Sequence, residues 1–189
     1  MKSVLISIQP KWCDLIFAGK KTVEIRRSKP KLEAPFKVYI YCTLSGSNEL
    51  FKDVLHGDVA AWNRGKWGLR KGNVIGEFVC DKAVEFPHNW YDPGYCESCT
   101  LACIDEYDLS QYLGDSAVGY GWHITDLKIY NEPKPLSMFY KECAGLDNTG
   151  MCYECENAVG EECDCALNGH LHLARPPQSW CYVEGFENA

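Results

Sequence analysis

The sequence has no long apolar stretch, no internal repeat and no low-complexity segment. A helix that crosses a bilayer needs about 18 or more apolar residues in a row, so we expect no membrane span. The opening residues, MKSVLISIQPKWCD, hold a short apolar run, but Gln9, Pro10 and Lys11 interrupt it too early for a secretory signal peptide. These absences favour a cytoplasmic protein whose thiols are mostly reduced.

Basic residues are missing from residues 142–165, which hold seven acids. Residues 1–40 have the opposite balance, with nine Lys and Arg against three acids, in a chain whose net charge is −7. A net negative charge argues against indiscriminate nucleic-acid binding, whereas the basic N-terminal part can attract an anion. At 189 residues and 46% hydrophobic, the chain is long enough for one globular domain with an insertion.

Strand and helix patterns alternate irregularly along the chain. Period-two alternation predicts strands at residues 3–8, 21–26, 36–43, 74–86, 122–130 and 176–184, with Gly76 as a candidate bulge. Helical spacing predicts helices at residues 10–18 and 104–114, a short one after Pro135 and a weak one at 49–55, whereas residues 88–100 are expected to form a loop. Many strands with a few short helices suggest an α+β fold built on a small mixed β-barrel.

The segment GKKTVEIRR, residues 19–27, places charged residues in a predicted strand. Because side chains alternate along a strand, Glu24 and Arg26 share a face, and Lys21 at the junction with the preceding helix can reach the same space. One interpretation is a solvated strand with a surface ion pair worth about 0–1 kcal/mol. The other is a polar cleft in which Lys21 binds phosphate or acts as a base, Glu24 accepts hydrogen bonds, and Arg26 holds Glu24 or a phosphate.

Two further stretches combine cationic and aromatic residues. Close to the motif, Gln9 can bind a base edge, with Lys11 beside it, and Trp12 either stacks on a base or fills the core. In the stretch WNRGKWGLRKG, a Gly-punctuated loop interleaves two Trp with basic residues; the candidate ligand-binding residues there are Trp62, Arg64, Lys66 and Trp67. This loop suits contact with a single-stranded nucleic acid, or it is a solvated loop whose two Trp pack on the domain.

The spacing Gly19-x-Lys21-x-x-Glu24-x-Arg26 resembles the G-x-K-x-x-E-x-R signature of ASCH domains, members of the PUA-like superfamily. The segments GEFVCDKAVEF, YGWHITDLKIYNEPKPL and RPPQSWCYVE are also similar to bacterial and phage ASCH proteins. The resemblance covers residues 1–45, 72–140 and 174–184. It implies a β-barrel with a cleft beside the first helix, with the motif on the cleft floor, and it implies binding of RNA or a modified nucleotide.

The resemblance also implies a possible activity, because some small ASCH proteins are amidohydrolases of acetylated cytidine and others are ribonucleases. The amidohydrolases use a Lys, a Thr and a Glu, of which the Lys corresponds to Lys21 and the Glu to Glu77. Glu24 stands where those enzymes have the Thr, and a carboxylate does not readily form the same intermediate as a hydroxyl. If the chain is an enzyme, Lys21 is the candidate base and Glu24 or Glu77 the candidate acid, in a hydrolase of a modified nucleoside or a ribonuclease.

Twelve cysteines fall into several groups. Cys42 and Cys80 lie in predicted strands and are expected in the core. Five others lie within an acidic stretch with little apolar periodicity: Cys143, Cys152, Cys155, Cys163 and Cys165. The first four are the candidate ligands of a structural zinc ion, with Cys165 competing with Cys163 for the fourth place. The alternatives are free thiols or disulfides, and Cys96, Cys99 and Cys103 are a weaker candidate metal site.

We therefore expect a PUA-like domain at residues 1–142 and 173–189, interrupted by a zinc-knuckle-like insertion at residues 143–172. The favoured function is binding of RNA or a nucleotide-like ligand in the cleft of Lys21, Glu24 and Arg26. The alternatives are the hydrolase described above and a protein-interaction module that recruits a partner through the acidic insertion.

Overall fold

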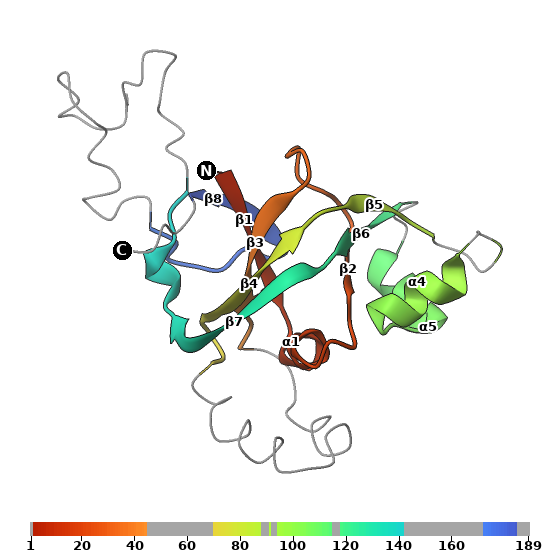
Figure 1. Cartoon of the computed structure of the whole chain (residues 1–189), viewed down its shortest axis with the longest axis horizontal. Helices are drawn as coiled ribbons and strands as arrows, with labels where there is room; N and C mark the ends of the chain where they lie inside the picture. Colours follow the sequence, from red (N-terminus) through yellow and green to blue (C-terminus); the bar gives the residue numbers. More distant parts are fainter. Residues whose placement is uncertain are drawn as a thin grey trace, which may run out of the picture.

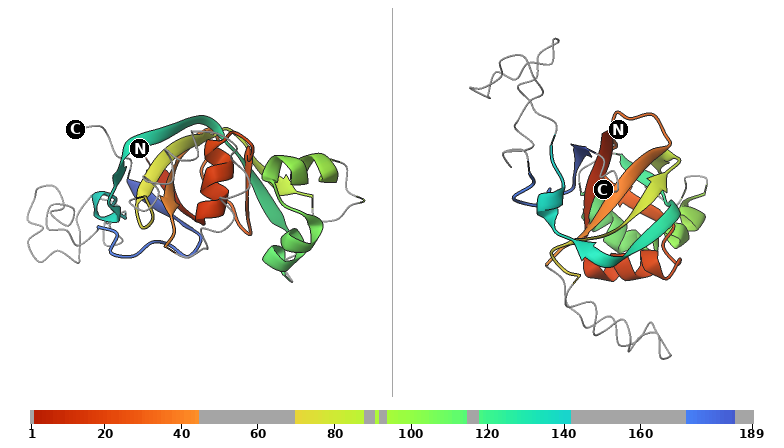
Figure 2. Two further views of the ribbon diagram at one scale, coloured as in Figure 1. Left: turned by 90° about the horizontal axis from the view of Figure 1, so that it is seen from below. Right: turned by 60° about the vertical axis from the view of Figure 1, so that its left-hand side comes forward.

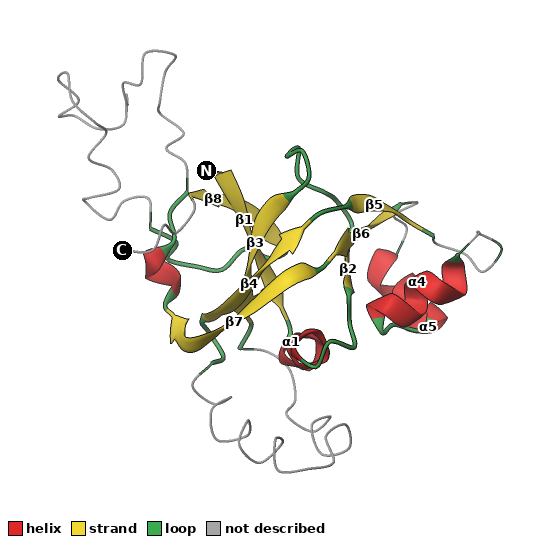
Figure 3. Ribbon diagram, viewed as in Figure 1, coloured by secondary structure: helices red, strands yellow, loops and turns green. Residues whose placement is uncertain are grey.

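The structure, a computed structural model, describes residues 2–44, 70–87, 91, 94–114, 118–141 and 172–184. Its strands are β1 (Lys2–Ile8), β2 (Val23–Arg26), β3 (Phe36–Cys42), β4 (Val74–Cys80), β5 (Ala83–Phe86), β6 (Gly119–His123), β7 (Thr125–Lys134) and β8 (Trp180–Glu184). Its helices are α1 (Pro10–Phe17), α4 (Tyr95–Ala102), α5 (Glu106–Leu113) and the short 3-10 helix η2 (Leu136–Met138), as Figure 3 shows. The predicted α+β class is confirmed. No helix in the described ranges has the length and apolar character that crossing a bilayer requires.

A five-stranded sheet, in the order β7-β4-β3-β1-β8, forms the centre of the molecule (Figure 1). β1 and β3 pair in parallel, whereas the other neighbours are antiparallel. The alternation predicted for β3 is confirmed, because Val38 and Ile40 pack into one core cluster while Tyr39 and Tyr41 pack into another. Both faces of β3 are therefore covered, and the sheet holds the two clusters apart.

A second sheet has the order β2-β6-β5, so the long strands predicted at 74–86 and 122–130 each divide in two. Asp81 and Lys82 separate β4 from β5, and Ile124 separates β6 from β7, which puts the two halves in different sheets. The ladders of the described strands do not show the closed barrel that we expected. Side chains bridge the two sheets instead: Trp180 Nε1 on β8 donates a hydrogen bond to Ser28 Oγ after β2, at 3.2 Å.

The irregularity predicted at Gly76 is confirmed. The β4–β7 ladder changes register between Val74 and Gly76. A Cβ atom at Gly76 would lie 2.6 Å from the carbonyl oxygen of Lys128 on β7. A side chain at this position would therefore push the two strands apart, and the glycine allows the close approach that the bulge needs.

Helix α1 ends in a turn that fixes the start of the charged motif. Gly19 adopts φ +68°; its N–H donates to the carbonyl of Ile16 and the N–H of Lys20 to the carbonyl of Leu15, both at 2.9 Å. These two bonds make a Schellman motif, which uses a left-handed residue to end a helix. The N–H of Lys21 bonds to the same Leu15 carbonyl at 3.0 Å. The helix end therefore sets the backbone position of Lys21.

The loop predicted at 88–100 is wrong from residue 95 onward, where α4 begins. The pattern hid this helix because only Tyr95 and Ala102 are buried, two turns apart, and the residues between them are exposed or half-buried. Helix α5, by contrast, shows the predicted helical spacing, and Leu109 and Leu113 are buried. Both helices pack in a cluster with Ile25 of β2, and Figures 1 and 2 place them together at one end of the molecule.

The left-handed conformation of Gly19 leads to a first prediction. A Cβ at this position would meet no atom within 4 Å, so only the backbone conformation requires glycine. We expect Gly19→Ala to lower the free energy of unfolding by about 1–2 kcal/mol. Gly19→Asn should recover part of this loss, because asparagine tolerates the left-handed region. Urea unfolding of the three chains measures the difference, and equal stabilities would contradict the assignment.

A second prediction concerns Asp14 on α1, where burial raises the pKa of the carboxyl from 3.8 to about 7. The folded chain thus binds this proton more tightly than the unfolded chain, so the protonated carboxyl favours folding. This contribution is complete below the unfolded value and is lost as the pH rises toward 7. We expect Asp14→Asn to gain stability relative to the natural chain between about pH 5 and about pH 8. Urea midpoints at the two pH values check this; a pH-independent difference would argue against a buried, protonated Asp14.

Candidate functional site

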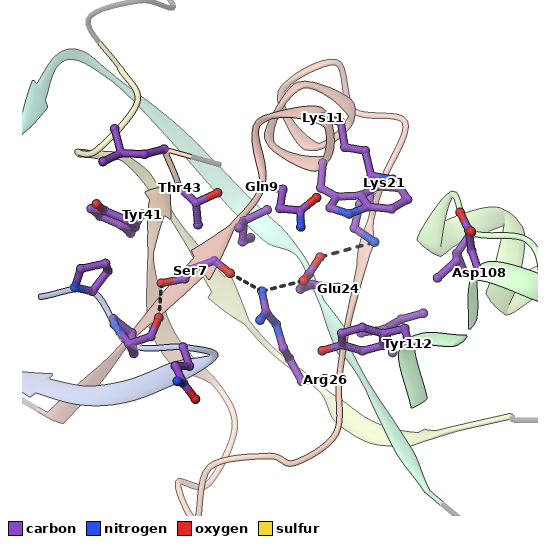
Figure 4. Close-up of a pocket in the computed structure, with 18 residues that line it drawn as sticks. Ser7, Gln9, Lys11, Lys21, Glu24, Arg26, Tyr41, Thr43, Asp108 and Tyr112 are labelled. Atoms are coloured by element: carbon purple, nitrogen blue, oxygen red, sulfur yellow. Dashed lines mark hydrogen bonds and ion pairs between the residues drawn. The ribbon is translucent and has the colours of Figure 1, made fainter. Parts of the chain in front are cut away.

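A cleft of about 750 Å³ lies between α1, β2, α5 and the segment that leads into β8 (Figure 4). The six predicted ligand-binding residues of the N-terminal part all line it: Gln9, Lys11, Trp12, Lys21, Glu24 and Arg26. Gln9 follows β1, Lys11 and Trp12 lie in the first turn of α1, Lys21 lies in the turn before β2, and Glu24 and Arg26 lie in β2. The structure thus brings together the residues that the motif and its upstream neighbours nominated.

Glu24 is the centre of a buried charged triad. One of its carboxylate oxygens lies 2.9 Å from Nη2 of Arg26, and the other lies 3.4 Å from Nζ of Lys21. Lys21, Glu24 and Arg26 are only 4%, 5% and 7% exposed. These values exclude the surface ion pair that the sequence left open, because a solvated pair would keep its side chains in water. The Glu24 carboxylate thus lies between an ammonium and a guanidinium group on the floor of the cleft.

Lys21 is held from a second side by the C-terminal end of α4. Its ammonium donates a hydrogen bond to the carbonyl of Ala102 at 2.7 Å, and the N–H of Thr22 donates to the carbonyl of Leu101 at 2.9 Å. The last carbonyl groups of a helix have no partner within the helix and carry its negative dipole end. Two consecutive residues of the motif therefore cap α4, and α4 orients the amine toward Glu24.

Arg26 connects the triad to the five-stranded sheet. Its Nη2 donates to the backbone carbonyl of Ser7 at 2.7 Å, and its Nη1 lies 3.4 Å from Ser179 Oγ. Its Nε is buried and finds no hydrogen-bond partner within the described residues. The guanidinium thus links β2 to the ends of β1 and β8, with one donor left unsatisfied.

Aromatic rings form the walls of the cleft beside the triad. The ammonium groups of Lys11 and Lys21 lie 4.3 and 5.0 Å from the centre of the Trp12 ring. Trp12 also packs partly against the main core cluster, so the ring is both a core contact and a cleft wall. On the opposite side, the cleft is lined by Tyr112, whose pKa is raised by burial. Arg27 donates to the carbonyl of Tyr112 through Nε at 2.9 Å and through Nη2.

The structure corrects the placement of Glu77, which we expected near the cleft. Glu77 lies directly opposite Tyr39 in the β3–β4 ladder, so both side chains project from the same face of the sheet. There it accepts a hydrogen bond from Tyr130 Oη at 2.5 Å and lies 3.6 Å from Lys37 Nζ. Glu77 does not line the cleft. Lys21 and Glu77 therefore do not form the Lys–Glu pair that the amidohydrolases use.

Several predicted residues lie outside the described part of the chain. These are Trp62, Arg64, Lys66 and Trp67 of the basic loop, and Cys143, Cys152, Cys155, Cys163 and Cys165 of the insertion, together with the predicted helix at 49–55. Their proposed roles, including structural zinc, stay predictions. Within the described ranges no group of three or more His, Cys, Asp or Glu is arranged to hold a metal ion, and this includes Cys96, Cys99 and Cys103.

Other residues that line the cleft were not predicted from the sequence. They include Thr43 after β3, Asp108 and Tyr112 on α5, and Gln178 before β8. The helical pattern predicted α5 itself, but nothing in its spacing indicates that it packs beside β2. Only the tertiary arrangement brings its polar face to the motif.

Comparison with known proteins agrees with this geometry. Residues 6–46, which contain the motif and both ends of α1, match the sequence family of the ASCH domain. A structure of ASCH from Zymomonas mobilis superposes with a TM-score of 0.56 at 18% identity, covering 96% of this chain and 87% of that one. A serine-to-alanine variant of the same protein gives 0.56 and 18%, covering 96% and 88%, and a tyrosine-to-phenylalanine variant gives 0.50 and 20%, covering 72% and 77%.

The sequence match therefore places residues 6–46 with the ASCH domain, the family that the motif resembles. At these identities the solved structures establish the fold only. No curated protein matches the sequence.

The buried triad leads to a third prediction. Glu24→Gln keeps the shape of the side chain but leaves two buried cations without their anion, and we expect a loss of about 3 kcal/mol in the free energy of unfolding. Glu77→Gln is the matched control, because Glu77 also faces two lysines, but these are 40% and 60% exposed. Its loss should stay within about 1 kcal/mol. Urea unfolding compares the two variants, and a larger loss for Glu77→Gln would contradict the central place of Glu24.

Proposed function

We propose that the protein binds RNA or a nucleotide-like ligand in the cleft beside α1. The observation that carries this proposal is the buried Lys21–Glu24–Arg26 triad at the floor of a cleft with aromatic walls. A nucleotide offers the complementary groups: a flat base that stacks on a ring, a polar base edge and an anionic phosphate.

The charges of the cleft favour an anion. Its charged lining residues are Lys11, Lys21, Glu24, Arg26 and Asp108, which leaves one positive charge in excess. Glu24 is already compensated by its two neighbours, so Lys11 at the cleft rim has no acidic partner in the triad. We assign Lys11 to a ligand phosphate, whose charge attracts an ammonium as a point charge.

The polar groups around the triad suit a base edge. Gln9 offers an amide that both donates and accepts, and Figure 4 shows its side chain close to Glu24. Each carboxylate oxygen of Glu24 keeps a second lone pair beyond the one that its cation uses. Gln9 and Glu24 can therefore bind the N–H and carbonyl groups of a base, while Trp12 or Tyr112 supports its face.

Binding is favoured over the hydrolase alternative by two observations. The carboxylate of Glu24 is occupied by two cations, and Glu77 lies on another face of the sheet. Glu24 is thus engaged as the counter-ion of Lys21 and Arg26, and Glu77 does not line the cleft with them. The match of residues 6–46 to the ASCH domain, in a superfamily associated with RNA, supports the same choice.

A ligand panel tests the proposal as a fourth prediction. Fluorescence anisotropy with short single-stranded RNAs, and calorimetry with nucleotides, should give binding that weakens with salt. We expect Lys11→Ala to weaken binding about tenfold and to reduce the salt slope by roughly one. The control is Lys37→Ala, because Lys37 lies beside Glu77, away from the cleft, and should bind as the natural chain does.

The same panel decides against the proposal if no ligand binds at low salt, or if Lys11→Ala and Lys37→Ala bind alike. Gln9→Ala should change the preference among bases and leave the salt slope unaltered, since an amide carries no charge. Cleavage of RNA or release of acetate from acetylated cytidine by the natural chain would favour the enzyme instead.

A further inference from the structure

Helix α4 carries three thiols that the cleft does not use. Cys96 and Cys99 lie about one turn apart within it, at its second and fifth residues, and Cys103 follows its last residue. All three are free; Cys96 is exposed, whereas Cys99 and Cys103 are half-buried. Of the other free thiols among the described residues, Cys13, Cys42 and Cys80 are fully buried and Cys181 is half-buried. Among the thiols that the structure describes, a reagent in solution therefore meets Cys96 first.

The spacing of Cys96 and Cys99 is close to that of a disulfide. Residues three apart on a helix have Cβ atoms about 5–6 Å apart, whereas a disulfide needs about 3.5–4.5 Å. A modest tightening of the first turn of α4 brings the sulfur atoms together. Burial raises the pKa of the Cys99 thiol, so the exposed Cys96 is the first to react and Cys99 the second.

The C-terminal end of the same helix binds two residues of the charged motif. The carbonyl of Ala102 accepts from the Lys21 ammonium, and that of Leu101 accepts from the Thr22 N–H. The next residue, Cys103, has φ +52°, an uncommon conformation for a residue with a side chain. Because α4 has only eight residues, the carbonyl groups of Leu101 and Ala102 lie within one turn of Cys99. We expect a tightening of the turn between Cys96 and Cys99 to shift these carbonyl groups relative to β2.

We propose that Cys96 and Cys99 form a thiol–disulfide pair, and that closing this disulfide loosens Lys21 and weakens the cleft for its ligand. The effect on the ligand rests on the proposed function, whereas disulfide formation and its effect on the α4–β2 hydrogen bonds do not. Such reversible disulfides are the kind found in reducing compartments, where they act as redox sensors.

The chemistry is a thiol–disulfide exchange with a small-molecule disulfide such as oxidised glutathione. The Cys96 thiolate attacks one sulfur of that disulfide, which releases one small thiol and leaves a mixed disulfide on Cys96. The Cys99 sulfur then attacks the Cys96 sulfur and releases the second small thiol. Two protein thiols are oxidised, one small disulfide is reduced to two thiols, and excess reduced thiol reverses both steps.

Peptide mapping of the oxidised full-length protein tests the pairing. Residues 83–127 contain no Lys or Arg and hold these three cysteines alone, so trypsin, which cuts after Lys82 and Lys128, isolates them from all the others. Glu97 lies between Cys96 and Cys99, and cleavage after it leaves the two halves joined only if Cys96 is bridged. We expect a joined fragment in the natural chain and in Cys103→Ser, and none in Cys96→Ser. Release of an unbridged Cys96 fragment from the oxidised natural chain would overturn the pairing.

Hydrogen exchange at the Thr22 amide tests the coupling without any ligand. This amide donates a hydrogen bond to the carbonyl of Leu101 at the C-terminal end of α4. Oxidation should therefore raise the exchange rate of the Thr22 amide about tenfold, the factor that corresponds to the loss of one hydrogen bond. Cys96→Ser should show no such change. The matched control is Cys181→Ser, a half-buried cysteine on β8, which should respond as the natural chain does.

Ligand binding completes the test. Oxidation should weaken binding of the RNA or nucleotide probe about tenfold in the natural chain and Cys181→Ser, and leave Cys96→Ser unchanged. If the disulfide forms while Thr22 exchange and affinity both stay constant, the coupling is wrong. If the reduced protein binds no probe, the proposed function fails, and Thr22 exchange alone still decides whether the disulfide acts on the motif.

Discussion

The carboxylate of Glu24 is the contact on which the site depends. It holds Lys21 on one side and Arg26 on the other, and each cation then bonds to a different part of the fold. Lys21 reaches the end of α4, and Arg26 reaches the carbonyl of Ser7 at the end of β1. One short strand thus connects the helical end of the molecule to the five-stranded sheet through charged hydrogen bonds, which are stronger than neutral ones.

The geometry of α1 makes this arrangement possible. A strand alone would place Lys21 on the face opposite to Glu24, because side chains alternate. The Schellman turn at Gly19 prevents this, since both Lys20 and Lys21 bond to the Leu15 carbonyl and β2 begins only at Val23. The irregular backbone between the helix and the strand therefore turns the ammonium toward the carboxylate. The spacing of the motif, with glycine first and arginine last, describes a helix end followed by one strand face.

Local sequence predicted those parts of the structure whose causes are local. Gly19 as a helix stop, the alternation of β3 and the shared face of Glu24 and Arg26 follow from residue type and period, and the structure agrees. Lys21 joins them because it lies at the junction of helix and strand. The division of residues 74–86 between two sheets, the helix at Tyr95–Ala102 and the position of Glu77 depend on strand pairing and packing. The alternation along the strand shows that Glu77 projects from the opposite face to its neighbours in the sequence. Only the pairing with Tyr39 decides which face of the sheet that is.

Stability alone does not account for a buried triad. Removing three charges from water costs several kcal/mol per ion, and apolar side chains of similar volume often stabilise a core better. Here the charges also lie at the floor of a cleft that Gln9 lines, and Arg26 Nε has no hydrogen-bond partner in the part of the chain that the structure describes. A charged cluster that keeps an unpaired hydrogen-bond donor and faces an open cleft is better explained by a polar ligand that binds to it. Lys21, a member of this cluster, also bonds to the end of α4. A change in α4 therefore alters the site of the same ligand.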